Sequence, residues 1–139
     1  MEKILVSACL LGIDSKYDGE NNKNEKILKL MDKYFFIPFC PEIMGGLSTP
    51  REPSEIVNNK VISSSGIDVT KEFVKGAKES LKLAKIYNIK KAIMKSKSPS
   101  CGYNKIYDGT FSHRIIKGDG VTAKLFLDNG IKIFTEEDI

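Results

Sequence analysis

The sequence has 139 residues, of which 41% are hydrophobic and 29% are charged, with a formal net charge of +4. This length suits one domain over residues 1–139, and the ordinary composition excludes a disordered chain, a collagen and a disulfide framework. Its apolar runs are too short to span a bilayer and no signal-peptide pattern opens it, so we expect a cytoplasmic protein without membrane association. The small positive charge is spread along the chain and gives no indication of a nucleic acid polymer as partner.

Apolar patterning predicts strands that alternate with helices. Strands are predicted at residues 4–8, 34–39, 91–95 and 131–135, and helices at residues 24–33, 70–88 and 119–130. In the longest helix, apolar residues recur every three to four positions from Phe73 to Ala84, and Thr70 is the expected N-cap. In the last helix, Asp119 is expected to cap the start and Gly130 the end.

The order of these elements predicts an α/β domain of three layers. Continuous apolar strands separated by helices are typical of a mainly parallel sheet, here of about four strands. Right-handed crossovers favour the flavodoxin-like order 2-1-3-4, in which the first strand lies between the second and the third. Residues 41–66 are rich in glycine and proline and predict a loop insertion, with at most a hairpin between residues 60–64 and 67–69.

The three cysteines follow three different predicted strands. Cys9 comes after the first strand, Cys40 after the second, and Cys101 in the loop after the third. Parallel strands end at the same edge of a sheet, and neighbouring strands lie about 4.8 Å apart. Ligands of open α/β sheets bind at that edge, so we expect the three thiols to converge there.

Three thiols from distant parts of the chain favour a metal or a cluster with soft ligands. Any one cysteine alone could equally be a small buried apolar residue. Zinc would need a fourth ligand, and His113 is the only histidine. An iron–sulfur cluster usually takes four thiolates, so three would leave one iron open to a substrate.

The loops that carry the cysteines also hold polar side chains. Glu42 stands two residues after Cys40 and could transfer a proton at this edge, or it could be a solvated glutamate. Ser98 and Ser100 flank Pro99 and suit turn formation, although Ser98 could also orient a reacting water.

Other signals at the same edge are weaker. The helix start at Asp119 could hold an anion or be simply capped. Lys95, Lys97 and Arg51 add positive charge and are individually typical of solvated side chains. Four aromatic residues could stack on a planar ring, with core packing as the alternative: Tyr17, Phe39, Tyr103 and Tyr107.

A series of motifs in this sequence resembles a bacterial family that includes the [4Fe–4S]-dependent thiouracil desulfidases. The motifs are Val6-Ser-Ala-Cys-Leu-Leu-Gly12, Lys16-Tyr-Asp-Gly19, Cys40-Pro-Glu42, Gly45-Gly-Leu47, Pro50-Arg51, Gly66-Ile-Asp-Val-Thr70, Ser98-Pro-Ser-Cys-Gly102, Ile106-Tyr-Asp-Gly109 and Gly118-Asp-Gly-Val-Thr-Ala123. They occur in the family's order and cover nearly the whole chain.

The resemblance implies removal of sulfur from 2-thiouracil and related small thiolated nucleobases, with release of sulfide. It implies a [4Fe–4S] cluster on Cys9, Cys40 and Cys101 with its fourth iron open, and catalytic roles for Glu42 and Ser98. Many members carry a further cysteine where this chain has Ser15-Lys16, so any role of a fourth thiol in those members has no counterpart at this position here.

Three functions therefore stay open at this point. The first is a hydrolytic desulfidase, in which water attacks the carbon of a C=S bond. The second is a sulfur carrier that uses the same cluster for sulfide trafficking. The third is a metal-free module that binds a small ligand, such as a nucleotide phosphate at the helix start near Asp119.

Overall fold

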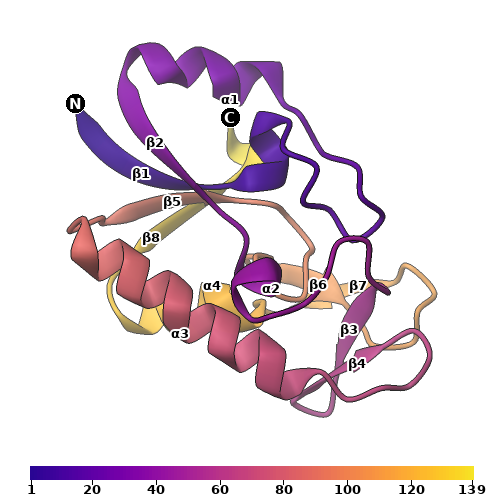
Figure 1. Ribbon diagram of the computed structural model, residues 1–139. Helices are drawn as coiled ribbons and strands as arrows, with labels where there is room; N and C mark the ends of the chain where they lie inside the picture. Colours follow the sequence, from indigo (N-terminus) through magenta and orange to yellow (C-terminus); the bar gives the residue numbers. More distant parts are fainter.

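The computed structural model describes residues 1–139 and shows a sheet of four parallel strands (Figure 1). The strands are β1 (Glu2–Ser7), β2 (Tyr34–Phe39), β5 (Lys91–Met94) and β8 (Lys132–Thr135). Their order is β2-β1-β5-β8, so the predicted α/β class and the predicted order 2-1-3-4 are confirmed. Leu5 and Val6 of the inner strand β1 are fully buried, as expected for a strand covered on both faces.

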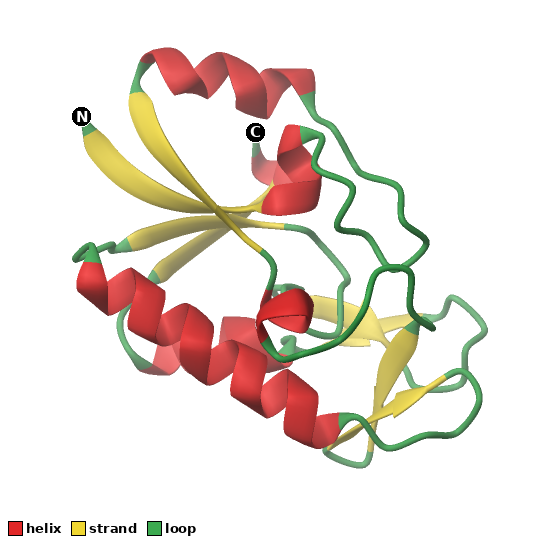
Figure 2. Cartoon of the chain, in the orientation of Figure 1, coloured by secondary structure: helices red, strands yellow, loops and turns green.

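Helices cover both faces of the sheet (Figures 1 and 2). The long helix α3 (Thr70–Ile86) and α4 (Val121–Asp128) lie on one face, where Phe126 and Leu5 belong to one buried apolar cluster. The short helix α1 (Glu25–Lys29) lies on the other face, where its Ile27 packs in a second cluster with Val6. Two apolar cores therefore hold the sheet rigid between them. None of the helices combines the length and the hydrophobicity that a membrane span requires.

The insertion after β2 contains more regular structure than predicted. It holds helix α2 (Pro41–Met44) and an antiparallel hairpin of β3 (Ser54–Val57) and β4 (Lys60–Ser63). The expected partner of β4 was residues 67–69, which form only an isolated bridge to it. The main partner of β4 is the preceding strand β3. Asn58 and Asn59 form the tight turn between these two strands, with positive φ angles of 50° and 65°.

A second hairpin was not predicted at all. Strands β6 (Lys105–Tyr107) and β7 (Ile115–Lys117) follow β5 and precede α4 in the chain, and they pair with each other. They lie near the first hairpin at one end of the molecule (Figure 1). Each strand has only three residues, and all three residues of β7 are exposed. Such a strand lacks the apolar alternation by which a hairpin is predicted from sequence.

The two predicted N-caps differ from those observed, whereas Gly130 ends α4 as predicted, with a positive φ of 78°. Helix α3 begins at Thr70, but its N-cap is Val69, and the Thr70 hydroxyl instead accepts a hydrogen bond from the backbone N–H of Val61 at 2.8 Å. Helix α4 begins two residues after Asp119, whose carboxylate accepts the backbone N–H of Asn104 at 2.7 Å. Both side chains therefore fasten neighbouring loops rather than the helices that they precede.

Helices α2 and α3 pack backbone to backbone through two glycines. A Cβ atom at Gly76 would collide with the carbonyl oxygen of Pro41, and one at Gly45 would collide with the carbonyl oxygen of Glu72. This contact fixes α2 at the carboxyl end of β2, directly behind the segment that carries Cys40.

We predict that Gly76→Ala destabilises the fold. In an exposed helix, glycine to alanine is stabilising by up to about 1 kcal/mol. Here the collision with Pro41 should reverse that sign and lower the free energy of unfolding by about 1–3 kcal/mol. Chemical denaturation would measure the change, with Lys78→Ala on the exposed side of α3 as the control. Unchanged or increased stability of Gly76→Ala would contradict the prediction.

Candidate functional site

A cavity of about 540 Å³ opens at the carboxyl edge of the sheet, and all three cysteines line it. Cys9 lies in the 3-10 helix that follows β1, Cys40 precedes α2 at the end of β2, and Cys101 lies in the loop after β5. Since β2, β1 and β5 are neighbours in the sheet, three distant positions of the chain meet at one place. Glu42 and Ser98 line the same cavity.

Cys101 is the most deeply buried of the three thiols. Its side chain is held by Ser7, whose hydroxyl donates to Sγ of Cys101 at 3.4 Å and accepts the backbone N–H of Lys95 at 3.0 Å. Burial raises the pKa of the Cys101 thiol far above its usual range. Ser7 was not predicted as a site residue, although its place at the end of β1, two residues before Cys9, was a signal for it.

Cys9 and Cys40 are half-buried at the cavity wall. Burial raises the pKa of both thiols, and a hydrogen bond with Asn22 partly offsets this for Cys9. The Cys40 thiol donates weakly to the carbonyl oxygen of Ser15 at 3.9 Å. Without a bound metal, all three cysteines are therefore thiols at neutral pH.

The donor set of this cavity fits a multi-iron cluster better than a single ion. No group of three or more His, Cys, Asp or Glu side chains is placed so that it could hold one metal ion. The ligands of a cluster bind different irons and so lie farther apart than the ligands of one ion. Three sulfur donors around one cavity have the softness that iron–sulfur clusters require. Ser15 also lines the cavity, but it offers no sulfur.

Arg51 forms a buried ion pair with Glu42 beside the thiols. Its Nε donates to Oε1 of Glu42 at 3.0 Å, and the two side chains are only 8% and 15% exposed. Its remaining N–H groups donate to Ser15 and Thr49 and, at 4.0 Å, to Sγ of Cys40. A guanidinium bound to several acceptors is rigid, so Glu42 has one fixed orientation in the cavity. Sequence analysis had treated Arg51 only as a general positive charge.

Ser98 and Glu42 come from separate loops but belong to one hydrogen-bonded group. Oγ of Ser98 accepts the backbone N–H groups of Ser100 and Cys101 at 3.1 and 3.0 Å, as expected of a turn-forming serine. The same oxygen lies 2.9 Å from Oγ of Ser100, and the Ser100 hydroxyl donates to Oε2 of Glu42 at 2.7 Å. Ser100 therefore connects the two candidate catalytic residues.

The start of α4 is closed to an anion, which removes one of the two alternatives for the Asp119 region. The backbone N–H of Val121 donates to the carbonyl of Pro99 at 2.9 Å, and those of Thr122 and Ala123 donate to the carbonyl of Ser100 at 3.0 and 3.1 Å. These bonds hold the loop that carries Cys101. No backbone N–H group at the start of α4 is therefore free to bind a nucleotide phosphate.

The lysines at the cavity are paired with acidic residues. Lys95 forms an ion pair with Glu136 at 2.9 Å, and Lys97 forms one with Glu137 at 3.6 Å. Both acidic residues belong to the last turn of the chain, so these pairs tie the C-terminal segment to the loop after β5.

The candidate aromatic residues divide between the cavity and the rest of the fold. Tyr17 and Tyr107 line the cavity, whereas Tyr103 does not. Phe39 lines it but is mainly a core residue, stacked on Phe126 with ring centroids 5.8 Å apart. His113 lies at the exposed rim and meets the Tyr107 ring edge to face at 5.7 Å.

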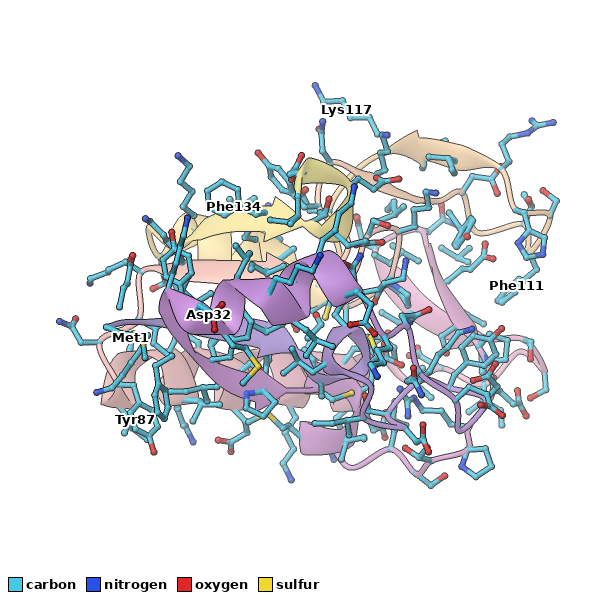
Figure 3. All side chains as sticks on the ribbon, turned by 90° about the horizontal axis from the view of Figure 1, so that it is seen from above. Met1, Asp32, Tyr87, Phe111, Lys117 and Phe134 are labelled. Carbon is cyan, nitrogen blue, oxygen red and sulfur yellow. The ribbon has the colours of Figure 1, made fainter.

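The outer wall of the cavity is formed by the loop between β6 and β7. Glu55 on β3 is buried, and its Oε1 accepts the backbone N–H groups of Gly109 and Phe111 at 3.0 and 3.1 Å. This anchor places Phe111 at the rim, at the end of the molecule opposite Met1 (Figure 3). Sequence analysis missed Glu55, because nothing in its local sequence indicates a partner more than fifty residues away.

Comparison with known proteins identifies the family. The sequence model of a family described as 2-thiouracil desulfurase matches residues 4–138. The chain belongs to this family. The expectation drawn from the sequence motifs is thereby confirmed.

Two relatives extend this result. The uncharacterized protein YbbK of Bacillus subtilis is 43% identical over 146 residues, which cover 98% of this chain and 97% of YbbK. A solved structure described as the [4Fe-4S]-dependent thiouracil desulfidase TudS is 41% identical, with a TM-score of 0.94. That match covers 100% of this chain and 93% of the TudS chain, so the fold around the cavity is shared throughout.

Proposed function

We propose that this protein is a hydrolytic, iron–sulfur-dependent desulfidase that removes sulfur from small thiolated nucleobases such as 2-thiouracil and releases sulfide. The observation that carries the proposal is the convergence of three thiols, and no fourth, on a cavity that also contains an oriented carboxylate and a serine. Membership of the 2-thiouracil desulfurase family and the likeness to TudS support it.

In this proposal Cys9, Cys40 and Cys101 hold a [4Fe–4S] cluster and leave one iron without a protein ligand. When bound, the cluster supplies a soft Lewis acid for the thiocarbonyl sulfur of the substrate. The protein supplies the geometry, because each cysteine lies in a segment that follows a strand of the rigid sheet.

The proton chemistry is assigned to Glu42 and Ser98. Hydrolysis of C=S to C=O consumes one water, whose two protons must leave the attacking oxygen. Glu42 is the acid–base group that accepts a proton and returns it, and Ser98 orients the water against the ring carbon. The ion pair with Arg51 keeps the carboxylate aimed into the cavity, so no reorientation is needed during the reaction.

The test is a desulfidation assay on anaerobically reconstituted protein. Protein loaded with iron and sulfide should convert 2-thiouracil to uracil and release one sulfide for each uracil formed. The same preparation without iron is the control and should be inactive. A loaded cluster that desulfurates no thiopyrimidine would refute the proposal.

We predict that cluster loading depends on pH in a defined direction. Ligation requires thiolates, and burial raises the pKa of all three thiols, so loading must release protons and become more favourable as the pH rises. The cluster-free protein should lose stability as the pH rises above about 8.5, where thiols of the unfolded chain ionise but the buried ones do not. Thermal unfolding of both forms against pH would measure this. Equal pH dependence of the two forms would contradict it.

A further inference from the structure

Ser100 occupies a position that the proposed chemistry has not yet used. Its side chain is 1% exposed, and its Oγ lies 2.9 Å from Oγ of Ser98 and 2.7 Å from Oε2 of Glu42. Both distances are typical of strong O–H···O hydrogen bonds. Ser98 has no hydrogen bond to Glu42 in the structure, so Ser100 is their connection.

The directions of these hydrogen bonds follow from the number of protons. A serine hydroxyl has one proton and two lone pairs, whereas a carboxylate can only accept. Ser100 must therefore donate its proton to Glu42, and Ser98 must donate its own proton to Ser100. The two lone pairs of Ser98 face the backbone N–H groups of Ser100 and Cys101. One of these N–H groups must release its hydrogen bond for Ser98 to accept the proton of the attacking water. The other stabilises the negative charge that develops on Ser98 as its own proton moves away.

We propose that Ser100 is the proton relay between Ser98 and Glu42, an inference that rests on the proposed function. As water attacks the thiocarbonyl carbon, its proton passes to Ser98, the Ser98 proton passes to Ser100, and the Ser100 proton passes to Glu42. Three O–H bonds form and three break, so both serines stay neutral and Glu42 holds the proton. The reverse shift returns a proton to the cavity. Ser100 acts through its neighbours and is a positioning residue.

The geometry favours a relay over a purely structural serine. Arg51 holds Oε1 of Glu42, which leaves Oε2 aimed at Ser100. A structural role would need only one hydrogen bond from the Ser100 hydroxyl, whereas this oxygen bridges two side chains that both line the cavity. The segment itself is already fixed by the bonds from the start of α4 to the Ser100 carbonyl, which any side chain at this position would keep.

The first test is Ser100→Ala, with Ser80→Ala as the matched control. Ser80 is also fully buried and donates to the carbonyl of Gly76, but it lies outside the cavity. We expect Ser100→Ala to keep the cluster absorbance and KM and to lose about 100-fold in kcat, as for an interrupted proton transfer. Ser80→Ala should keep kcat. A Ser100→Ala protein with the kcat of Ser80→Ala would overturn the relay.

A double variant tests whether the two serines act along one path. If Ser98 works through Ser100, then Ser98→Ala combined with Ser100→Ala should have the kcat of the slower single variant. Independent roles would multiply the two losses instead. Multiplied losses would overturn the relay and leave only a structural role for Ser100.

A measurement without turnover separates this inference from the proposed function. The infrared carboxylate band of Glu42, identified by its loss in Glu42→Gln, should shift in Ser100→Ala and not in Ser80→Ala, because Ser100 donates to that carboxylate whereas Ser80 donates to the carbonyl of Gly76. An unshifted band would refute the relay. A shifted band in a protein that desulfurates nothing would keep the hydrogen-bonded group and refute the proposed function alone.

Discussion

Alanine in place of any one of Cys9, Cys40 and Cys101 is expected to give a protein that holds no stable cluster. The cavity offers three sulfur donors and no fourth, so each substitution would leave the cluster with two protein ligands. Serine in place of cysteine should fail as well, because an alcohol oxygen is a hard donor with a much higher pKa than a thiol. Iron content, acid-labile sulfide and visible absorbance after anaerobic reconstitution would measure the loss.

The control for the cysteine variants is Ser54→Ala. Ser54 lines the same cavity from β3 and supplies no sulfur, so this variant should load normally. A cooperative thermal unfolding transition in each cluster-free variant would show that the alanine substitution has not prevented folding. A cluster that survives in one cysteine variant would remove that residue from the proposed ligand set.

Glu42→Gln is expected to have the second-largest effect. Glutamine has nearly the same shape but neither a charge nor a carboxyl proton, so kcat should fall about 10²- to 10⁴-fold, as for the loss of a general acid–base group. The cluster should remain, because Glu42 supplies none of the three sulfurs. The melting temperature should fall as well, because the buried guanidinium of Arg51 loses its anionic partner.

Glu42→Asp separates the effect of losing the carboxylate charge from the effect of moving the carboxylate away from the substrate. Aspartate keeps the carboxylate one methylene farther from the cavity, so it should restore the stability lost in Glu42→Gln more fully than it restores kcat. Steady-state kinetics on cluster-normalised samples and thermal unfolding would give the two quantities. A Glu42→Gln enzyme with wild-type kcat would exclude the proposed acid–base role.

The sheet and its order were predictable because their signals are local. Continuous apolar runs such as that of β1 specify strands buried on both faces, and the intervening amphipathic helices force parallel pairing. Helix α2 and the hairpin of β6 and β7 were not predictable, since three- and four-residue elements carry no periodicity of their own. They form because the chain around them is held by tertiary contacts, such as the one between Gly76 and Pro41.

The candidate site also contains residues that local sequence signals predicted and residues whose contacts depend on the tertiary fold. The three cysteines were found because the carboxyl ends of parallel strands meet at one edge, a rule that needs only the order of the elements. The roles assigned to Arg51 and Ser100 rest on side-chain contacts between distant parts of the sequence. Arg51 is 36 positions from Ser15, and Ser100 is 58 positions from Glu42. No local pattern encodes such contacts, so both residues were predicted only as a general charge and a turn former.

The order of the strands also determines when the cysteines can meet during synthesis of the chain. Strand β2 pairs with β1 along its whole length, so the two strands that place Cys9 and Cys40 side by side are both present once the first third of the protein has emerged. Cys101 joins them only when β5 has docked on β1, and β5 is covered on its other edge by β8, the last strand to be made. A growing chain therefore contains two of the thiols long before the third, and the complete set of three sulfur donors exists only after residue 101 has been made.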